Sequence, residues 1–287
     1  RIQDKSRKVP DLPELGIEGV GLRNLEEALE SPNGIIINTG PTGSGKTTTL
    51  YSCLNRLNTP EVNILTIEDP VEIQVDGLNQ SQVHHDIDYD FATGMRSALR
   101  QDPDIIMVGE IRDKETGNTA IEASLTGHLV FSTLHTNSAV ESLTRLLNMG
   151  IPPYLLTSTI ELIIAQRLVR KLCDKCKRLA QAAADTLEMV KHALDQLHVE
   201  GEVDPALVAG MQFYEAVGCA ECNNVGYHGR VGLYEVLRMD NELRRLISDS
   251  AQNLDILAAA QKNGMVTLEQ AGIIKALKGE TSLEEVY

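Results

Sequence analysis

The sequence predicts an α/β fold with a mostly parallel β-sheet. Four short apolar runs lie in its first half: GIIINT (34–39), VNILTI (62–67), DIIMVG (104–109) and HLVFSTL (128–134). Amphipathic stretches with helical spacing separate these runs. Runs that are apolar throughout, instead of alternating with polar residues, are typical of strands buried on both faces by helices. The alternation of the two kinds of segment therefore indicates a parallel sheet.

Length and composition fit a soluble protein with one large domain and a smaller one. The chain has 287 residues, of which 42% are hydrophobic. No apolar run approaches the roughly 18 residues that a membrane span needs. The chain starts at Arg1 instead of Met, and no signal-peptide pattern follows. We expect a piece of a longer chain.

The net charge argues against nucleic acid as the main partner. The formal charge is -15 at pH 7. Proteins hold phosphate backbones with basic surfaces, which this composition does not favour overall, although a local basic patch remains compatible with it.

Along the chain, residues 1–19 mix charges with prolines and glycines and predict a linker. Later helices carry their own start and stop signals. Ser138–Glu141 and Thr267–Gln270 are capping-box patterns, with Gly150 and Gly279 as the matching stops. Ser282–Glu285 predicts a further helix start. Residues 180–200 also have helical character but are polar enough to predict an exposed insertion.

A glycine-rich loop follows the first predicted strand. Its pattern, Gly-x4-Gly-Lys-Thr between a buried strand and a helix, is that of a P-loop. Backbone N–H groups of such a loop surround the β-phosphate, while Lys46 neutralises phosphate oxygens and the Thr47 hydroxyl binds Mg²⁺. A glycine-rich turn that binds nothing would not need this strand, helix, Lys and Thr together. The predicted nucleotide-binding residues are Gly40, Pro41, Thr42, Gly43, Ser44, Gly45, Lys46, Thr47 and Thr48.

Polar residues gather where ligands bind in parallel sheets, at the carboxyl ends of strands. They are Glu68, Asp69 and Glu72; Glu110 and Arg112; and His135, with His128 at the start of the same strand. We expect each to reach the γ-phosphate. Hydrolysis needs a carboxylate that orients or deprotonates the attacking water, a polar group that binds Mg²⁺, and a side chain that senses the γ-phosphate. Glu68 and Glu110 can supply the first two roles, and His135 can supply the third. Each acid alone has the alternative role of capping the next helix.

Two arginines share a predicted helix, FATGMRSALRQ. Arg96 and Arg100 are spaced i, i+4 and would lie on one face. This face either is solvated or reaches a phosphate or a neighbouring subunit.

Four of the five cysteines form two CxxC pairs, Cys173–Cys176 and Cys219–Cys222. Two such pairs predict a tetrahedral zinc site with four thiolate ligands. Free buried thiols and a redox CxxC are the alternatives, and both explain the paired spacing less well. Cys53 stands alone in the helix after the P-loop and is expected to be a packing residue.

Together these segments resemble the motor ATPases of type II secretion and type IV pilus assembly. The resemblance runs from about Leu15 to the C-terminus. It rests on four motifs in the family's order: GPTGSGKTTTLY, TIEDPVE, LRQDPDIIMVGEIRD and TGHLVFSTLHTN.

The resemblance implies a RecA-like P-loop NTPase core that works as a ring of six subunits. By this match, Lys46 and Thr47 bind the phosphate and Mg²⁺, and Glu68 and Glu110 act on the attacking water and the metal ion. The Walker B segment ends in VGE, so Glu110 replaces the usual Asp. Five further residues also match the family's motifs: Arg96, Arg100, Arg112, His128 and His135.

The resemblance also implies cofactors and partners. These are ATP, Mg²⁺ and Zn²⁺, an inner-membrane platform protein, and a cytoplasmic membrane-anchor partner, with the protein itself cytoplasmic and peripheral at the inner membrane. Assembly and secretion motors carry the tetracysteine insert that pilus-retraction motors lack, which favours the former. Family members also have a preceding PAS-like domain whose arginines complete the site. RIQDKS (1–6) resembles only its last strand, so weak ATPase activity and poor hexamer formation are expected of this chain alone.

The predicted organisation is therefore a linker with the end of a PAS-like domain (1–19), an ATPase core (20–170), a zinc-binding subdomain (171–232) and a C-terminal helical subdomain (233–287). Two other functions compete with a motor ATPase. A nucleic-acid-translocating RecA-like ATPase conflicts with the acidic charge and the His motif. A nucleotide-binding scaffold without turnover conflicts with the intact acidic residues.

Overall fold

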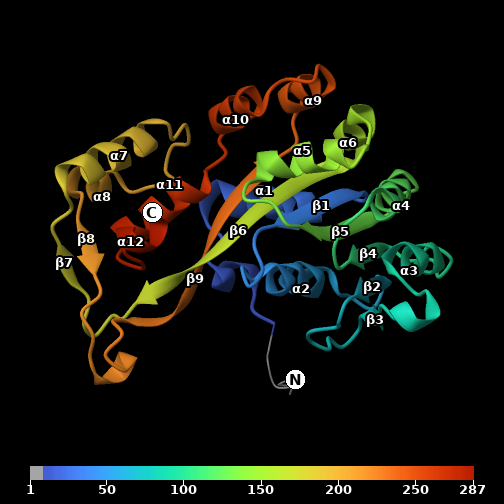
Figure 1. Ribbon diagram of the computed structural model, residues 1–287, viewed down its shortest axis with the longest axis horizontal. Helices are drawn as coiled ribbons and strands as arrows, with labels where there is room; N and C mark the ends of the chain where they lie inside the picture. Colours follow the sequence, from blue (N-terminus) through green and yellow to red (C-terminus); the bar gives the residue numbers. More distant parts are fainter. Residues whose placement is uncertain (1–8) are drawn as a thin grey trace.

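The computed structural model describes residues 9–287 and contains a seven-stranded sheet in the order β3-β2-β4-β5-β1-β6-β9 (Figure 1). All neighbouring strands are parallel except β9, which is antiparallel to β6. The predicted α/β class with a mostly parallel sheet is confirmed. The strands are β1 (Gly34–Thr39), β2 (Ile64–Glu68), β3 (Asn79–Gln82), β4 (Ile105–Val108), β5 (Leu129–Leu134), β6 (Ile160–Leu172) and β9 (Tyr227–Arg238).

Helices cover both faces of this sheet, which explains why its strands are apolar throughout. Side chains alternate between the faces along a strand, so Ile36 packs on one core while Ile35 and Ile37 pack on the other. Two helices cover the Ile36 face: α1 (Gly19–Leu29) and α2 (Lys46–Leu57). The helices on the opposite face are α3 (Phe91–Ala98), α4 (Lys114–Leu125), α5 (Ala139–Asn148), α6 (Pro153–Thr159), α9 (Asn241–Ser248) and α10 (Asn253–Lys262).

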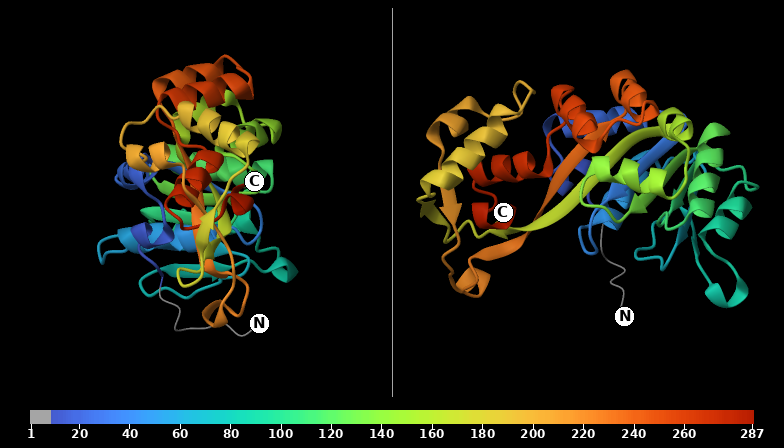
Figure 2. Two further views of the ribbon diagram at one scale, coloured as in Figure 1. Left: turned by 90° about the vertical axis from the view of Figure 1, so that its left-hand side faces the viewer. Right: turned by 45° about the horizontal axis from the view of Figure 1, so that its top comes forward.

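A smaller lobe stands beside the sheet, at the left of Figure 1 and of the right-hand view in Figure 2. The long strands β6 and β9 extend out of the main sheet to reach it. It has its own apolar core, which includes Val190, Phe213 and Ile273. Its elements are the two-stranded sheet of β7 (Arg178–Ala180) and β8 (Phe213–Glu215), with α7 (Ala184–Asp195), α8 (Pro205–Gly210), α11 (Leu268–Leu277) and α12 (Leu283–Val286).

Within residues 180–200, Ala184–Asp195 form α7, whose outer face is exposed as predicted, while its inner face belongs to the apolar core of the small lobe. Val190, Ala193 and Leu194 of α7 are buried. The Gln270 side chain of α11 also donates a hydrogen bond to the Ala193 carbonyl oxygen at 2.8 Å. The polar residues of α7 occupy its outer face, and its apolar residues pack against α11.

The predicted helix signals agree with the structure. Ser138 accepts a hydrogen bond from the Glu141 N–H at 3.2 Å, and Thr267 forms a complete capping box with Gln270. Gly150 and Gly279 follow the last helical turns with φ of 85° and 70°, the left-handed conformation that glycine adopts without strain.

The described part of the predicted linker is packed against the main domain. A short 3-10 helix spans Leu12–Leu15, and the side chains of Leu12 and Ile17 are buried in the core beneath α1 and α2. The segment 1–6, predicted as the end of a PAS-like domain, lies outside the described residues. Within residues 9–287, every helix is too short or too polar to cross a bilayer.

Candidate nucleotide site and cysteine cluster

The glycine-rich loop connects β1 directly to α2 and lies against β6. Gly40 and Gly45 have φ of 150° and 90°, which disfavour any residue with a side chain. A Cβ atom on Gly40 would lie 2.3 Å from the backbone oxygen of Gln166, and one on Gly45 would lie 2.9 Å from its side-chain nitrogen. The loop can follow this path only with glycine at both positions.

Lys46 lies inside the curve of this loop. Its Nζ donates hydrogen bonds to the carbonyl oxygens of Gly40 and Pro41, at 2.7 and 3.1 Å. Burial lowers the pKa of Lys46, and the charge of Glu110 offsets part of this effect. The hydroxyl of Ser44 is buried and has no hydrogen-bond partner among residues 9–287. A buried hydroxyl without a partner beside a buried ammonium group fits a site for an anionic ligand.

Glu110 lies at the carboxyl edge of the sheet, two residues beyond β4. Its neighbours in the chain are held by adjacent strands, because Gly109 N–H donates to the Ile67 oxygen at 2.8 Å and Ile111 N–H donates to the Thr133 oxygen at 3.0 Å. Backbone hydrogen bonds on both sides therefore determine the position of this carboxylate.

The structure brings Glu110 together with two of the predicted catalytic residues. Glu110 forms an ion pair with Arg112, and its Oε2 lies 3.4 Å from Nε2 of His135, which follows β5. The Glu110 carboxylate raises the pKa of Arg112 through their hydrogen bond. Arg112 and His135 are about half exposed, whereas Glu110 is mostly buried. A carboxylate, a guanidinium and an imidazole thus meet near Lys46, as the strand-end pattern predicts.

Glu68 is the last residue of β2 but belongs to a separate, buried cluster. Its carboxylate accepts hydrogen bonds from the Tyr51 hydroxyl, from the Thr66 hydroxyl at 2.6 Å and from the Gln80 amide at 3.2 Å. Burial raises the pKa of Glu68, although these hydrogen bonds oppose the shift. Asp69 and Glu72 follow in the loop after β2, where Asp69 Oδ2 lies 3.6 Å from Nε2 of His85.

Two predicted positions differ in the structure. Helix α3 ends at Ala98, so Arg100 lies two residues beyond it, in the turn that leaves the helix. Arg96 instead pairs with Glu115 of α4 at 2.7 Å. His128 precedes β5 and therefore lies at the amino edge of the sheet, opposite the P-loop. Its Nδ1 is 2.8 Å from the Ala123 carbonyl oxygen, and the prediction that it reaches the γ-phosphate edge is wrong.

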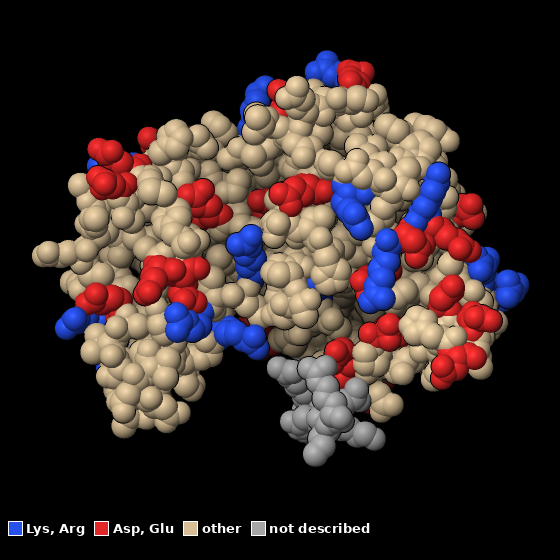
Figure 3. All heavy atoms as spheres, viewed as in Figure 1, with Lys and Arg blue, Asp and Glu red and all other residues tan. Residues whose placement is uncertain are grey.

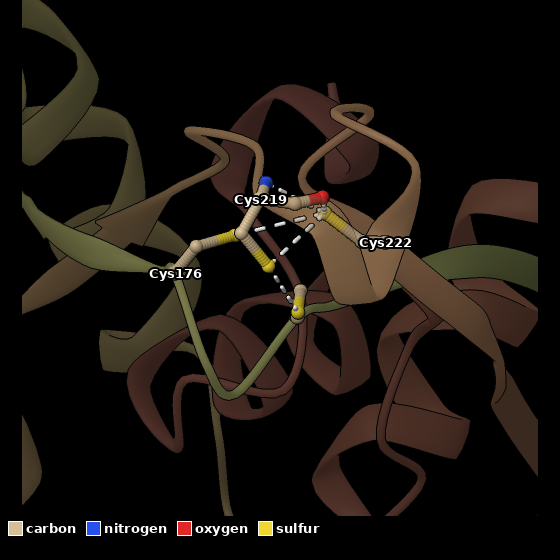
Figure 4. A group of neighbouring side chains, drawn as sticks. Cys176, Cys219 and Cys222 are labelled. Atoms are coloured by element: carbon tan, nitrogen blue, oxygen red, sulfur yellow. Dashed lines mark hydrogen bonds between the residues drawn. The ribbon is translucent and has the colours of Figure 1, made fainter.

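The four paired cysteines come together where β6 and β9 meet the small lobe (Figure 4). Their sulfur atoms lie within 4.8 Å of one another, with three close pairs at 3.7, 3.8 and 3.9 Å. Four thiolates at about 2.3 Å from one tetrahedral ion would be roughly 3.8 Å apart. The cluster consists of Cys173, Cys176, Cys219 and Cys222.

Backbone N–H groups support a thiolate in this cluster. Cys222 accepts hydrogen bonds from the N–H groups of Cys219 and Gly226, both at 3.2 Å. Burial opposes ionisation of Cys222, but these donors, together with hydrogen bonds from the side chains of Cys219 and Cys176, outweigh it and lower its pKa to about 6. The donor set and spacing fit a tetrahedral metal ion. Cys53, by contrast, is fully buried in α2, where burial raises its pKa to about 12.

Sequence patterns gave little indication of two buried polar residues near the site. Gln166 accepts hydrogen bonds from Asn38 at 3.0 Å and from Thr49 of α2 at 2.9 Å. The sequence feature that could have indicated Gln166 is that it interrupts the apolar run IELIIAQRLV. Tyr51 ends the predicted P-loop motif and is fully buried beside Glu68.

Comparison with known proteins gives consistent results. The sequence profile of the family described as "Type II/IV secretion system protein" matches residues 1–287. The chain is 48% identical over 286 residues to the type IV pilus assembly ATPase PilB of Pseudomonas aeruginosa, covering 100% of this chain and 48% of that protein. It is 44% identical over 286 residues to type II secretion system protein E of Klebsiella pneumoniae, covering 100% of this chain and 54% of that protein.

A solved structure shares the fold. The pilus retraction motor PilT with bound ADP has a TM-score of 0.68 and 29% identity, covering 99% of this chain and 67% of that one. The chain spans about half the length of the curated relatives it matches.

Proposed function

The chain belongs to the family of type II/IV secretion system proteins, and from this membership we propose that it is the ATP-hydrolysing part of a secretion or pilus-assembly motor. The observation that carries the proposal is the meeting of Glu110, Arg112 and His135 at the sheet edge that also holds Lys46. The relatives whose names include ATPase lend support, as does the ADP bound to PilT.

In this mechanism the P-loop binds the triphosphate and Lys46 neutralises its oxygens. The Thr47 hydroxyl would hold Mg²⁺, which would supply positive charge to stabilise the phosphate oxygens. Glu110 orients the attacking water and accepts its proton, since a partly buried carboxylate beside a cation is available at this edge. Arg112 and His135 then compensate the negative charge that develops on the transferred phosphoryl group.

The test is steady-state ATP hydrolysis by purified protein. Lys46→Ala should abolish nucleotide binding and turnover. Glu110→Gln should keep ATP binding but lower kcat by at least about 100-fold, because it removes the proton acceptor. Lys262→Ala and Glu122→Gln remove exposed groups away from the site and serve as matched controls.

Unchanged hydrolysis in Lys46→Ala would end the enzyme proposal in favour of a scaffold. Hydrolysis stimulated by DNA would instead favour a nucleic-acid motor.

The further proposals concern the larger assembly. We infer a ring of six in the complete protein, acting on an inner-membrane platform protein and a membrane-anchor partner from the cytoplasmic side. The tetracysteine cluster favours an assembly or secretion motor and zinc as its ion. Light scattering with a non-hydrolysable ATP analogue tests the ring.

A further inference from the structure

The cluster around Glu68 lies directly beneath the P-loop helix. Tyr51 comes from the second turn of α2, the helix whose first turn carries Lys46 and Thr47. Its hydroxyl is hydrogen-bonded to Glu68 of β2, and both side chains are buried, Glu68 with 3% exposure. Leu50 and Leu54 of α2 make apolar contacts with the sheet. Two further hydrogen bonds join α2 to other strands, from Thr49 to Gln166 of β6 at 2.9 Å and from Asn38 of β1 to the Lys46 carbonyl oxygen at 3.4 Å. The Tyr51–Glu68 hydrogen bond is a directional contact that helps to fix the position of this helix against β2.

The same cluster reaches the loop that follows β2. Gln80 of β3 donates to Glu68 at 3.2 Å and to the Ile73 carbonyl oxygen at 2.9 Å. Its side-chain oxygen accepts from the Val75 N–H at 2.8 Å. The Gln80 amide thus links the loop between Glu68 and Gln80 to the Glu68 carboxylate.

Glu68 is poorly placed to act as a general base. A base needs a lone pair that faces the attacking water. Both oxygens of Glu68 instead accept hydrogen bonds from protein groups: Tyr51 on one oxygen, and Thr66 and Gln80 on the other. Both oxygens of Glu110 also lie next to side chains, those of Arg112 and His135, but these two side chains are about half exposed at the sheet edge, where water has access.

We propose that Glu68 is a positioning residue of the nucleotide site, acting with Tyr51 and Gln80 to hold the P-loop helix and the loop after β2 in place. This assignment rests on the proposed ATPase function and corrects the role that the sequence motif suggests for Glu68. Its consequence is that Glu68 acts mainly on nucleotide binding, whereas Glu110 acts on the chemical step.

The test separates KM from kcat. Tyr51→Phe, which keeps the ring but removes the hydroxyl, should raise KM for ATP and the Kd of a fluorescent ATP analogue about 3- to 10-fold, with a smaller change in kcat. Glu68→Ala should do the same more strongly. Glu68→Gln should restore most of the affinity, because an amide can still accept from Thr66 and can donate to the Tyr51 hydroxyl. Tyr154→Phe, on the exposed side of α6, is the matched control.

Three outcomes would overturn the assignment. The first is a kcat loss in Glu68→Gln as large as that in Glu110→Gln, with ATP still bound, which would make Glu68 the base. The second is lower thermal stability in Tyr51→Phe and Glu68→Ala with unchanged KM and Kd, which would make the cluster purely structural. In both cases an inactive Lys46→Ala variant leaves the ATPase proposal intact. The third is an active Lys46→Ala variant, in which case both proposals fail together.

Discussion

At the scale of a single residue, the buried carboxylate of Glu235 holds the first turns of two helices. It accepts hydrogen bonds from the N–H of Ala139 at 2.8 Å and of Leu268 at 3.4 Å, which begin α5 and α11. Burial nevertheless raises the pKa of Glu235 above its ordinary 4.5. The neighbouring charge of Glu141 adds to this shift, while the two N–H groups and Arg167 oppose it.

This pKa shift predicts a pH dependence of stability. Above pH 4.5 the folded protein keeps a proton on Glu235 that the unfolded chain has lost, so the free energy of unfolding falls as pH rises through the raised pKa. The slope from this group is at most about 1.4 kcal/mol per pH unit. Glu235→Gln should remove it, so the stability of the native protein relative to the variant should decline from pH 5 to pH 8 in urea unfolding. Parallel pH profiles for the two proteins would contradict the prediction.

Single residues also show which contacts of the site could be predicted from the sequence and which could not. The P-loop was predictable because Gly40, Gly45 and Lys46 act within one short segment. Glu110 and His135 were predictable because the ends of parallel strands share one edge. The partners of Glu68 and Glu235 were not, since those contacts join distant parts of the chain. The motif therefore suggested a catalytic role for Glu68, although its carboxylate is buried and hydrogen-bonded to other side chains.

At the scale of secondary structure, the main error of the sequence-based prediction is the position at which one helix ends. The segment FATGMRSALRQ has helical spacing throughout, but α3 stops at Ala98. Asp102 then has φ of 50° and precedes Pro103, a residue that disfavours helical conformation before it. Arg100 consequently lies in the turn that leaves the helix. In the sequence, the dipeptide Asp102–Pro103 was the feature that could have indicated this early end of the helix.

Gln166 joins four elements through one buried amide. It accepts from Asn38 of β1 and Thr49 of α2, and it donates to the Tyr234 hydroxyl of β9 at 3.2 Å. Tyr234 in turn donates to the Leu15 carbonyl oxygen at 3.3 Å. Burial raises the pKa of Tyr234 to about 12, so this hydroxyl stays protonated.

Gln166→Leu should therefore lower the free energy of unfolding by about 2–4 kcal/mol, because several buried polar groups lose a partner at once. Chemical denaturation of the variant beside native protein measures this loss. Gln196→Leu replaces an exposed glutamine at the end of α7 and should change stability by less than about 0.5 kcal/mol. Similar small effects in both variants would show that the network contributes little.

At the scale of the whole molecule, the net charge argues against a nucleic-acid motor. Acidic and basic side chains are interspersed over the face shown in Figure 3, and the formal net charge is -15. We expect single- or double-stranded DNA to leave ATP hydrolysis unchanged at about 0.1 M salt, where phosphate contacts would still be strong. Stimulation that weakens as salt is raised would contradict this expectation.

The two lobes are joined by the β6–β9 ladder, and the cysteine cluster lies at its far end. Cys173 directly follows the last residue of β6, and Cys222 lies shortly before β9 begins. The C-terminal segment is attached at the same place, since Leu172 N–H donates to the Glu280 oxygen at 2.8 Å and Lys177 Nζ donates to the Gly279 oxygen at 2.8 Å. An ion in the cluster would thus fasten both strands and the end of the chain together.

Loss of that ion should loosen the small lobe more than the nucleotide-binding core. The apolar core of the lobe is separate from the two cores that flank the main sheet. We expect one zinc per chain in elemental analysis, and Cys176→Ser should lose it. Amide exchange should then increase in α7 and α11, while α2 stays protected and ATP still binds. Cys53→Ala removes a thiol outside the cluster and should keep the zinc. Metal-free native protein, or equal loosening of α2 in Cys176→Ser, would show that the cluster does not fasten this lobe through a bound ion.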